Sequence, residues 1–127
     1  MRFKDRRRAR KEAIEREEEL ERTRQLRTST YSNLMSDICR FKICILATYP
    51  SDPSKINIST ERFESFRDIR SDINRNLNRL KELGVDIPEK VEGTINGASL
   101  QDFTCLEDCN KYFEKLGSVL RTIIVYY

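Results

Sequence analysis

The chain has 127 residues, of which 38% are hydrophobic and 35% are charged, and its formal net charge is +3. This length fits one domain with a modest core, and the composition is more polar than that of an average globular domain. No stretch approaches the roughly 20 consecutive apolar residues of a membrane span, and the charged N-terminus lacks the apolar run of an ordinary secretory signal. We therefore expect a cytoplasmic protein without a membrane segment.

Charge is unevenly distributed along the chain. Residues 1–30 hold 11 Lys/Arg and 7 Asp/Glu, a net charge of +4, whereas the remainder holds 13 and 14, a net charge of −1. Within the first 30 residues a basic cluster comes first, and acidic residues dominate positions 12–21. We define the basic cluster as Arg6, Arg7, Arg8, Arg10 and Lys11. Electrostatic interactions with a partner are therefore expected at the N-terminal end.

The first predicted helix is unusually long, because no Gly or Pro occurs before Pro50. Apolar residues at its C-terminal end step by three and four, as on one face of a helix: Tyr31, Leu34, Ile38, Phe41 and Ile45. A helix over residues 5–47 measures about 65 Å at 1.5 Å per residue. The later helices are too short to cover it, so residues 1–30 are predicted to form a charged arm and residues 31–47 to enter the core.

A second helix is predicted over residues 59–83. Its apolar positions also step by three and four: Phe63, Phe66, Ile69, Ile73, Leu77 and Leu80. Ser59 is a suitable N-cap, and Ile58 before it could pack on Phe63 as a hydrophobic staple. Gly84 is placed to end the helix.

A third helix is predicted over residues 99–125, opening with a capping-box pattern at Ser99 and Asp102. Its apolar positions include Phe103, Leu106, Cys109, Phe113, Leu116, Leu120 and Ile123. A short helical turn, with Asp86 and Glu89 spaced as a cap, is expected in the connection before it. The predicted fold is therefore all-α: residues 31–127 form a three-helix bundle with helices at about 31–47, 59–83 and 99–125, and a long charged N-terminal helix projects from it.

The residue types argue against catalysis. Histidine is absent, which removes the commonest general base and metal ligand, and the four glycines form no phosphate-binding loop. Glu64, Asp68 and Asp72 form an acidic stripe on the second helix, but nearby Arg67 and Arg75 favour a salt-bridged solvent face. We therefore expect no enzyme activity, metal or cofactor.

The four cysteines are expected to be reduced and buried, because they lie on or beside apolar stripes. They are Cys39, Cys44, Cys105 and Cys109. A zinc site is disfavoured, because thiols five residues apart on one helix diverge around its axis.

The arm is expected to be helical, because many of its charges can pair four residues apart. These pairs are Arg8–Glu12, Lys11–Glu15, Glu12–Arg16 and Glu18–Arg22. The basic cluster lies at the positive end of the helix dipole, where cations are unfavourable. Binding to an anionic partner is one reason for such an arrangement.

Several partners are compatible with this arm. An acidic protein surface is favoured, in an adaptor, inhibitor or accessory factor, an analogy that rests on size and composition. The alternative is a nucleic-acid-binding accessory protein whose cluster contacts phosphates, although Phe3 is the only aromatic residue available for stacking and residues 12–21 would repel a duplex. Self-association is left open, because Ile14, Leu20 and Leu26 do not keep heptad spacing. Tyr126 and Tyr127 are a possible secondary interface.

Overall fold

The computed structural model describes residues 3–47, 60–103 and 105–123, and these form four α-helices and one short 3-10 helix. In chain order the elements are α1 (Phe3–Ala47), α2 (Thr60–Glu82), α3 (Glu89–Asn96), η2 (Leu100–Asp102) and α4 (Leu106–Leu120). The prediction of an all-helical chain with a long first helix is confirmed. The number of helices differs, because α3 is a helix of eight residues rather than a brief turn.

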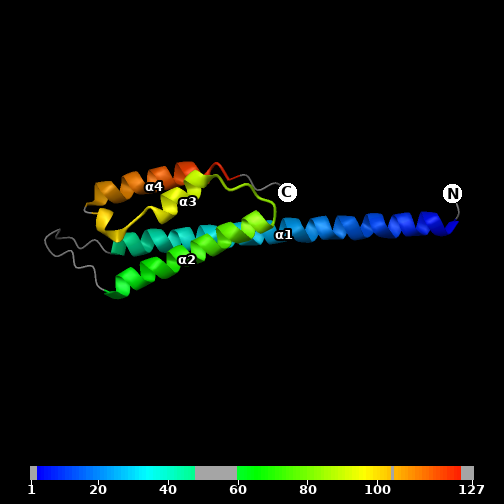
Figure 1. The fold of residues 1–127 in the computed structure, drawn as a ribbon, viewed down its shortest axis with the longest axis horizontal. Helices are drawn as coiled ribbons and strands as arrows, with labels where there is room; N and C mark the ends of the chain where they lie inside the picture. Colours follow the sequence, from blue (N-terminus) through cyan, green and yellow to red (C-terminus); the bar gives the residue numbers. More distant parts are fainter. Residues whose placement is uncertain (1–2, 48–59, 104, 124–127) are drawn as a thin grey trace.

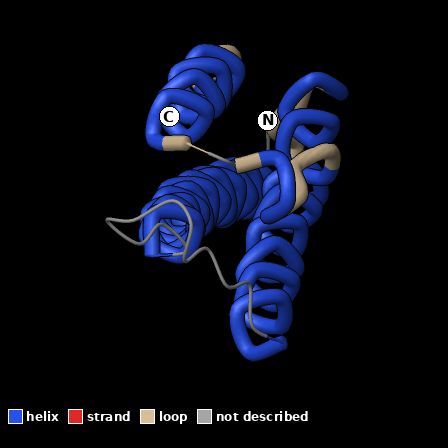
Figure 2. Tube along the Cα trace, turned by 90° about the vertical axis from the view of Figure 1, so that its left-hand side faces the viewer, coloured by secondary structure: helices blue, strands red, loops and turns tan. Residues whose placement is uncertain are grey.

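The other helices pack along the C-terminal half of α1. α2 and α4 both run antiparallel to it, while its N-terminal half extends away from them (Figure 1). Seen nearly along α1, α2 and α4 lie on different sides of it (Figure 2). Side chains of α1 are exposed from Lys4 to Arg22, and partial burial begins at Thr23 and Arg27. The name arm was used above for the predicted segment 1–30. From here on it means residues 3–22, and the body means the remaining described residues.

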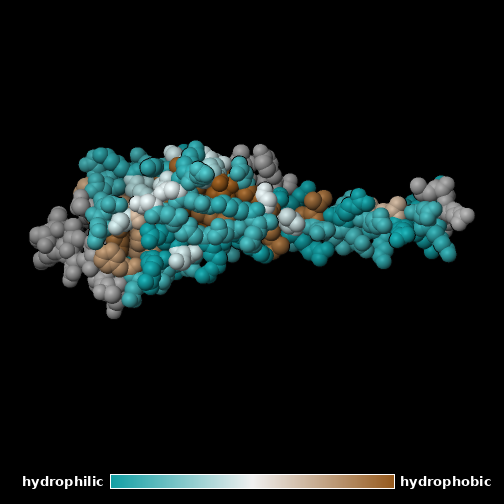
Figure 3. All heavy atoms as spheres, viewed as in Figure 1, coloured by the Kyte–Doolittle hydropathy of each residue, from teal (hydrophilic) through white to brown (hydrophobic). Residues whose placement is uncertain are grey.

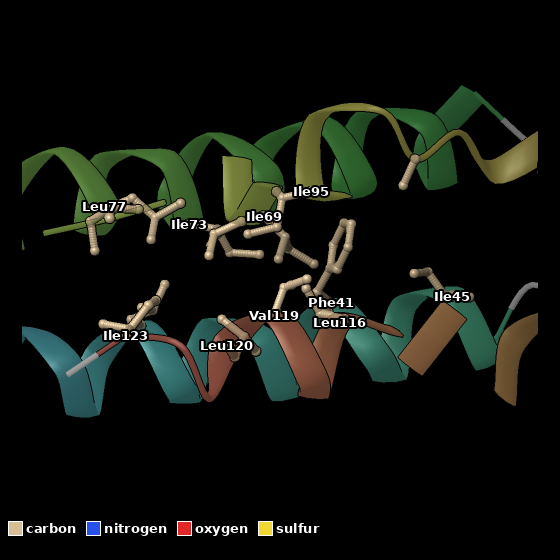
Figure 4. Packing of buried hydrophobic residues seen from close by; sticks show 14 of the residues in the cluster. Phe41, Ile45, Ile69, Ile73, Leu77, Ile95, Leu116, Val119, Leu120 and Ile123 are labelled. Carbon is tan, nitrogen blue, oxygen red and sulfur yellow. The ribbon is translucent and has the colours of Figure 1, made fainter. Parts of the chain in front are cut away.

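The core lies where α1, α2 and α4 face one another. Leu34, Phe41 and Ile45 of α1 are fully buried, as the apolar spacing predicts. Isoleucines and leucines of α2 point toward them, and apolar side chains of α4 close the cluster (Figure 4). Phe41 stacks on Phe66 with ring centroids 4.8 Å apart. The core therefore joins elements that are far apart in the sequence.

α2 ends in a Schellman motif. The amide of Gly84 donates to the carbonyl of Lys81 at 3.0 Å, and the amide of Val85 donates to the carbonyl of Leu80 at 2.9 Å. Gly84 has a φ of +85°, which a residue with a Cβ adopts only at a cost. The prediction that Gly84 ends the helix is confirmed, whereas the predicted N-cap Ser59 and the residue before it lie outside the described residues.

The prediction that the apolar stripes are buried is wrong at two positions. Phe63 is 38% exposed, because it lies in the first turns of α2 and lines an open groove beside Leu100 instead of packing under α1. Leu106 is 58% exposed, because it begins α4 one turn before the helix reaches the core at Cys109. The other apolar residues of the α2 stripe, Phe66 to Leu80, are buried as predicted.

The predicted helix over residues 99–125 is also wrong in its extent. Ser99 and Asp102 do form a capping box, but it starts only the single turn η2. Phe103 follows in an extended conformation and is buried, packing edge-on against Tyr112 with centroids 5.2 Å apart. Burial of this ring breaks the helix, which resumes at Leu106 and ends at Leu120. Residues 124 and 125 lie outside the described residues.

α3 is fixed between α2 and α4. The hydroxyl of Tyr112 donates to the carbonyl of Thr94 at 2.9 Å, and Asn74 exchanges hydrogen bonds with Asn96. Burial raises the pKa of the Tyr112 phenol, so the group stays a donor across the physiological range. Pro88 occupies the N-cap of α3 without a side-chain cap bond, so the expected cap from Asp86 and Glu89 is wrong.

Replacement of Phe41 by Ala should reduce the free energy of unfolding by about 3–5 kcal/mol, because it removes a fully buried ring from the centre of the core. Ile43→Ala is the matched control on the same helix. Its side chain is 66% exposed, and its loss should cost less than about 0.5 kcal/mol. Urea denaturation followed by circular dichroism measures both. Equal effects of the two substitutions would contradict this packing.

Candidate partner-binding arm

The arm is a helix without tertiary contacts among the described residues. It spans about 30 Å at 1.5 Å per residue, and every side chain from Lys4 to Arg22 is exposed. Its surface is almost entirely hydrophilic, in contrast to the apolar patches of the body (Figure 3). Ile14 and Leu20 are its large apolar exceptions, at 56% and 59% exposure. The arm therefore contributes little to the core and leaves its whole circumference accessible.

Local ion pairs support the arm, as the spacing of its charges predicts. Glu12 forms ion pairs with Arg8 at 3.6 Å and with Arg16 at 3.9 Å, one turn to either side. The expected Glu18–Arg22 pair takes another form, because the Arg22 Nε donates to the backbone carbonyl of Glu18 at 3.5 Å. The described ion pairs do not include one between Lys11 and Glu15. Each exposed pair of this kind stabilises a helix by only about 0.2–0.5 kcal/mol.

The basic cluster surrounds much of the helix near its N-terminus. At about 100° per residue, Arg7, Arg8 and Lys11 occupy one side, and Arg6 and Arg10 occupy the adjoining side. All five side chains are exposed. The structure therefore brings the predicted residues together as a basic surface over roughly 9 Å of helix, followed by the acidic segment, and not as a pocket. Such a surface can form charge-assisted hydrogen bonds with carboxylates or phosphates.

The arm meets the body at Arg27, whose role the sequence did not indicate. Its Nε donates to the carbonyl of Leu83 at 2.7 Å, at the C-terminal end of α2. A Cβ at Gly84 would come within 3.0 Å of the same guanidinium. Arg27 therefore satisfies a helix-end carbonyl and fixes the point where the arm leaves the body. A contact between residues so distant in the sequence has no local pattern that could have predicted it.

A polar network holds the exposed edge between α1 and α2. Asn76 donates to Asp37 at 2.7 Å, and Arg40 contacts both Asp37 at 3.0 Å and Asp72 at 3.4 Å. Arg75 pairs with Asp72 at 3.4 Å. The prediction that the acidic stripe of α2 is salt-bridged is confirmed at Asp72. These carboxylates are occupied by cations of the chain itself, which argues for a structural role.

The prediction that all four cysteines are buried is wrong, since two of them are exposed to solvent. Cys109 is buried and Cys44 is half-buried, whereas Cys39 and Cys105 are exposed. All four are free. Burial raises the pKa of the Cys109 thiol, with smaller contributions from Asp108 and Cys105, and burial also raises that of Cys44. Within the described residues no group of acidic or cysteine side chains is arranged to hold a metal ion.

An open groove of about 600 Å³ lies between α2 and the residues around η2. Arg70 crosses it, stacking on Phe66 at 5.2 Å and donating to the carbonyl of Ala98 at 2.9 Å. The guanidinium is thereby engaged in packing. The predicted secondary interface, Tyr126 and Tyr127, lies outside the described residues.

No family model matches this chain, and no curated protein or solved structure matches it either. None of the described helices is long and apolar enough to cross a membrane. The assignment of function therefore depends on the geometry and charge of the chain itself.

Alkylation of the native protein at mildly alkaline pH should modify Cys39 and Cys105 first, because their thiols are exposed. Cys109 should react at least about tenfold more slowly, because it is buried and its raised pKa lowers the thiolate fraction. Mass spectrometry of peptides over a time course measures the four rates. Labelling in denaturant is the control, and rates that remain equal in the native protein would contradict the structure.

Proposed function

We propose that this chain is a non-catalytic cytoplasmic binding protein that acts by protein–protein interaction. In this proposal the body is a helical bundle that holds the arm, and the basic cluster contacts an acidic surface of the partner. An adaptor, an inhibitor or an accessory factor would act in this way. The observation that carries the proposal is the exposed arm, about 30 Å of helix that adds no buried surface to the core.

The energetics of the arm support a binding role. Basic residues at the helix N-terminus oppose the dipole, so their position lowers the intrinsic stability of the arm. An acidic partner would reverse that cost by neutralising the cluster. It would also gain charge-assisted hydrogen bonds from several arginines, which suit planar carboxylates.

Nucleic acid is the second candidate, because the same cations could contact several phosphates. The acidic segment that follows, residues 12–21, is exposed on the same helix and would repel a duplex lying along the arm. A short acidic protein surface meets the cluster without reaching that segment. This difference favours a protein partner.

The test replaces Arg6, Arg7, Arg8, Arg10 and Lys11 together by Gln, which removes the charge and keeps good helix formers. The matched control makes the same five-charge change on exposed body positions: Arg67, Arg75, Arg79, Lys90 and Lys111. Affinity capture from an extract of the native cell should lose its partner with the arm variant, by at least about tenfold, and keep it with the control. The melting temperature should change little, because exposed charges each contribute less than about 0.5 kcal/mol.

A salt series on the captured complex and on a labelled oligonucleotide separates the two candidates. Phosphate contacts give a steep linear fall of log affinity with log salt, with a slope near −0.9 per contact on duplex DNA. Capture of the same partner by both variants would show that the arm is only a structural extension. Tight, steeply salt-dependent oligonucleotide binding would replace the protein partner with nucleic acid.

A further inference from the structure

One face of the arm carries a heptad pattern made of charges. The residues step by three, four, three, four and three, which places them in one stripe along the helix. All of them are exposed. In order they are Lys4, Arg7, Lys11, Ile14, Glu18 and Glu21, and we call them the charged stripe. Its first half is basic, its second half is acidic, and its one apolar member lies near the middle.

The charged stripe faces away from the body. Leu34 and Phe41 mark the side of α1 that enters the core. At about 100° per residue, Glu18 lies about 160° around the helix from Leu34, and Ile14 about 200°. A second helix could therefore lie along the stripe, on the side of α1 that faces away from Leu34 and Phe41.

The described ion pairs of the arm lie partly beside this stripe and partly on it. Glu12 and Arg16 lie on the far side of the helix from the stripe, whereas Arg8, which also pairs with Glu12, flanks the stripe. Among the charged stripe's side chains, a described ion pair engages Glu21, with Arg24 at 3.8 Å. These pairs are exposed and individually weak, so they can exchange for ion pairs with a second chain.

Two antiparallel copies of the charged stripe place opposite charges against each other. If a second copy lies antiparallel with the two-fold axis between residues 12 and 13, Lys4 faces Glu21 of the second copy and Arg7 faces its Glu18. Lys11 faces Ile14, and its aliphatic stem can cover that side chain, which is 56% exposed in the single chain.

The residues flanking the stripe follow the same rule. In an antiparallel pair, Arg8 approaches Glu15 of the second copy, and Arg10 approaches its Glu17. Symmetry repeats each contact, and all of these pairs join opposite charges. A parallel pair in register would instead place Lys4, Arg7 and Glu18 each against its own copy, so repulsion selects the antiparallel arrangement.

The length of the arm matches this overlap. Antiparallel pairing from residue 4 to residue 21 uses the exposed helix almost completely, and burial against the body begins just beyond it, at Thr23. The N-terminal end of each arm would then reach the body of the other copy, and the two bodies would lie at opposite ends of the dimer.

We propose that the charged stripe is a dimerisation surface, on which the arms of two copies of this chain pack antiparallel. This inference rests on the proposed function, since it names a second copy as an acidic partner of the basic cluster. The interface is mostly exposed ion pairs, so the dimer is weak and is dissociated by salt.

The experiment is sedimentation equilibrium of the full chain and two charge-reversed variants. One variant carries Lys4→Glu and Arg7→Glu, and the other carries Glu18→Lys and Glu21→Lys. At low salt the unchanged chain should dimerise, and each variant alone should dimerise at least about tenfold more weakly, because like charges then face each other. An equal mixture should recover dimers, because every reversed charge again meets its opposite.

A third variant, Arg67→Glu with Lys111→Glu, is the matched control. It changes the net charge as much as Lys4→Glu with Arg7→Glu, but at exposed positions of the body, and should dimerise like the unchanged chain. A mixture of the two reversed variants that stays monomeric, or an unchanged chain that stays monomeric at low salt, would overturn the inference. If the glutamine variant of the basic cluster then still loses an unrelated acidic partner, the proposed function stands without the dimer.

Discussion

The packing of Leu34, Phe41 and Ile45 of α1 against α2 is the interaction on which the rest of the structure depends. Starting a helix is costly, with a nucleation constant on the order of 10⁻³, whereas adding residues to an existing helix is close to neutral. The buried half of α1 supplies that start. The arm is then an extension of a helix that the core has already formed, supported by weak local pairs such as Arg8–Glu12.

Two contacts separate the body from the arm. Arg27 hydrogen-bonds the carbonyl at the end of α2, and Gly84 turns the chain away at the same place. Residues before Thr23 are therefore beyond the reach of the other helices. This division leaves the arm free to carry charge patterns that a packed helix could not tolerate, and both the proposed partner site and the proposed dimer surface use that freedom.

The sequence predicted the features that local periodicity controls. The long α1, the C-terminal limit of α2 and the stop at Gly84 follow from the apolar spacing, the absence of breakers and the need for a left-handed residue. The break between η2 and α4 escaped prediction, because burying Phe103 against Tyr112 is a tertiary effect that overrides a helical pattern. The exposure of Cys39 and Cys105 was not predicted for a related reason. Periodicity shows which residues share one face of a helix, but it does not show whether another element covers that face. The basic cluster was predicted from charge alone, whereas the anchor Arg27 required the fold.

The backbone chemical shifts of residues 4–22 in the full chain test the claim that the core nucleates the helix of the arm. We expect helical Cα shifts throughout these residues, and much weaker helical shifts in an isolated peptide of the same residues, because the peptide lacks the nucleus that the core provides. Random-coil shifts for residues 4–22 in the full chain, alongside intact helical shifts for α2 and α4, would contradict it.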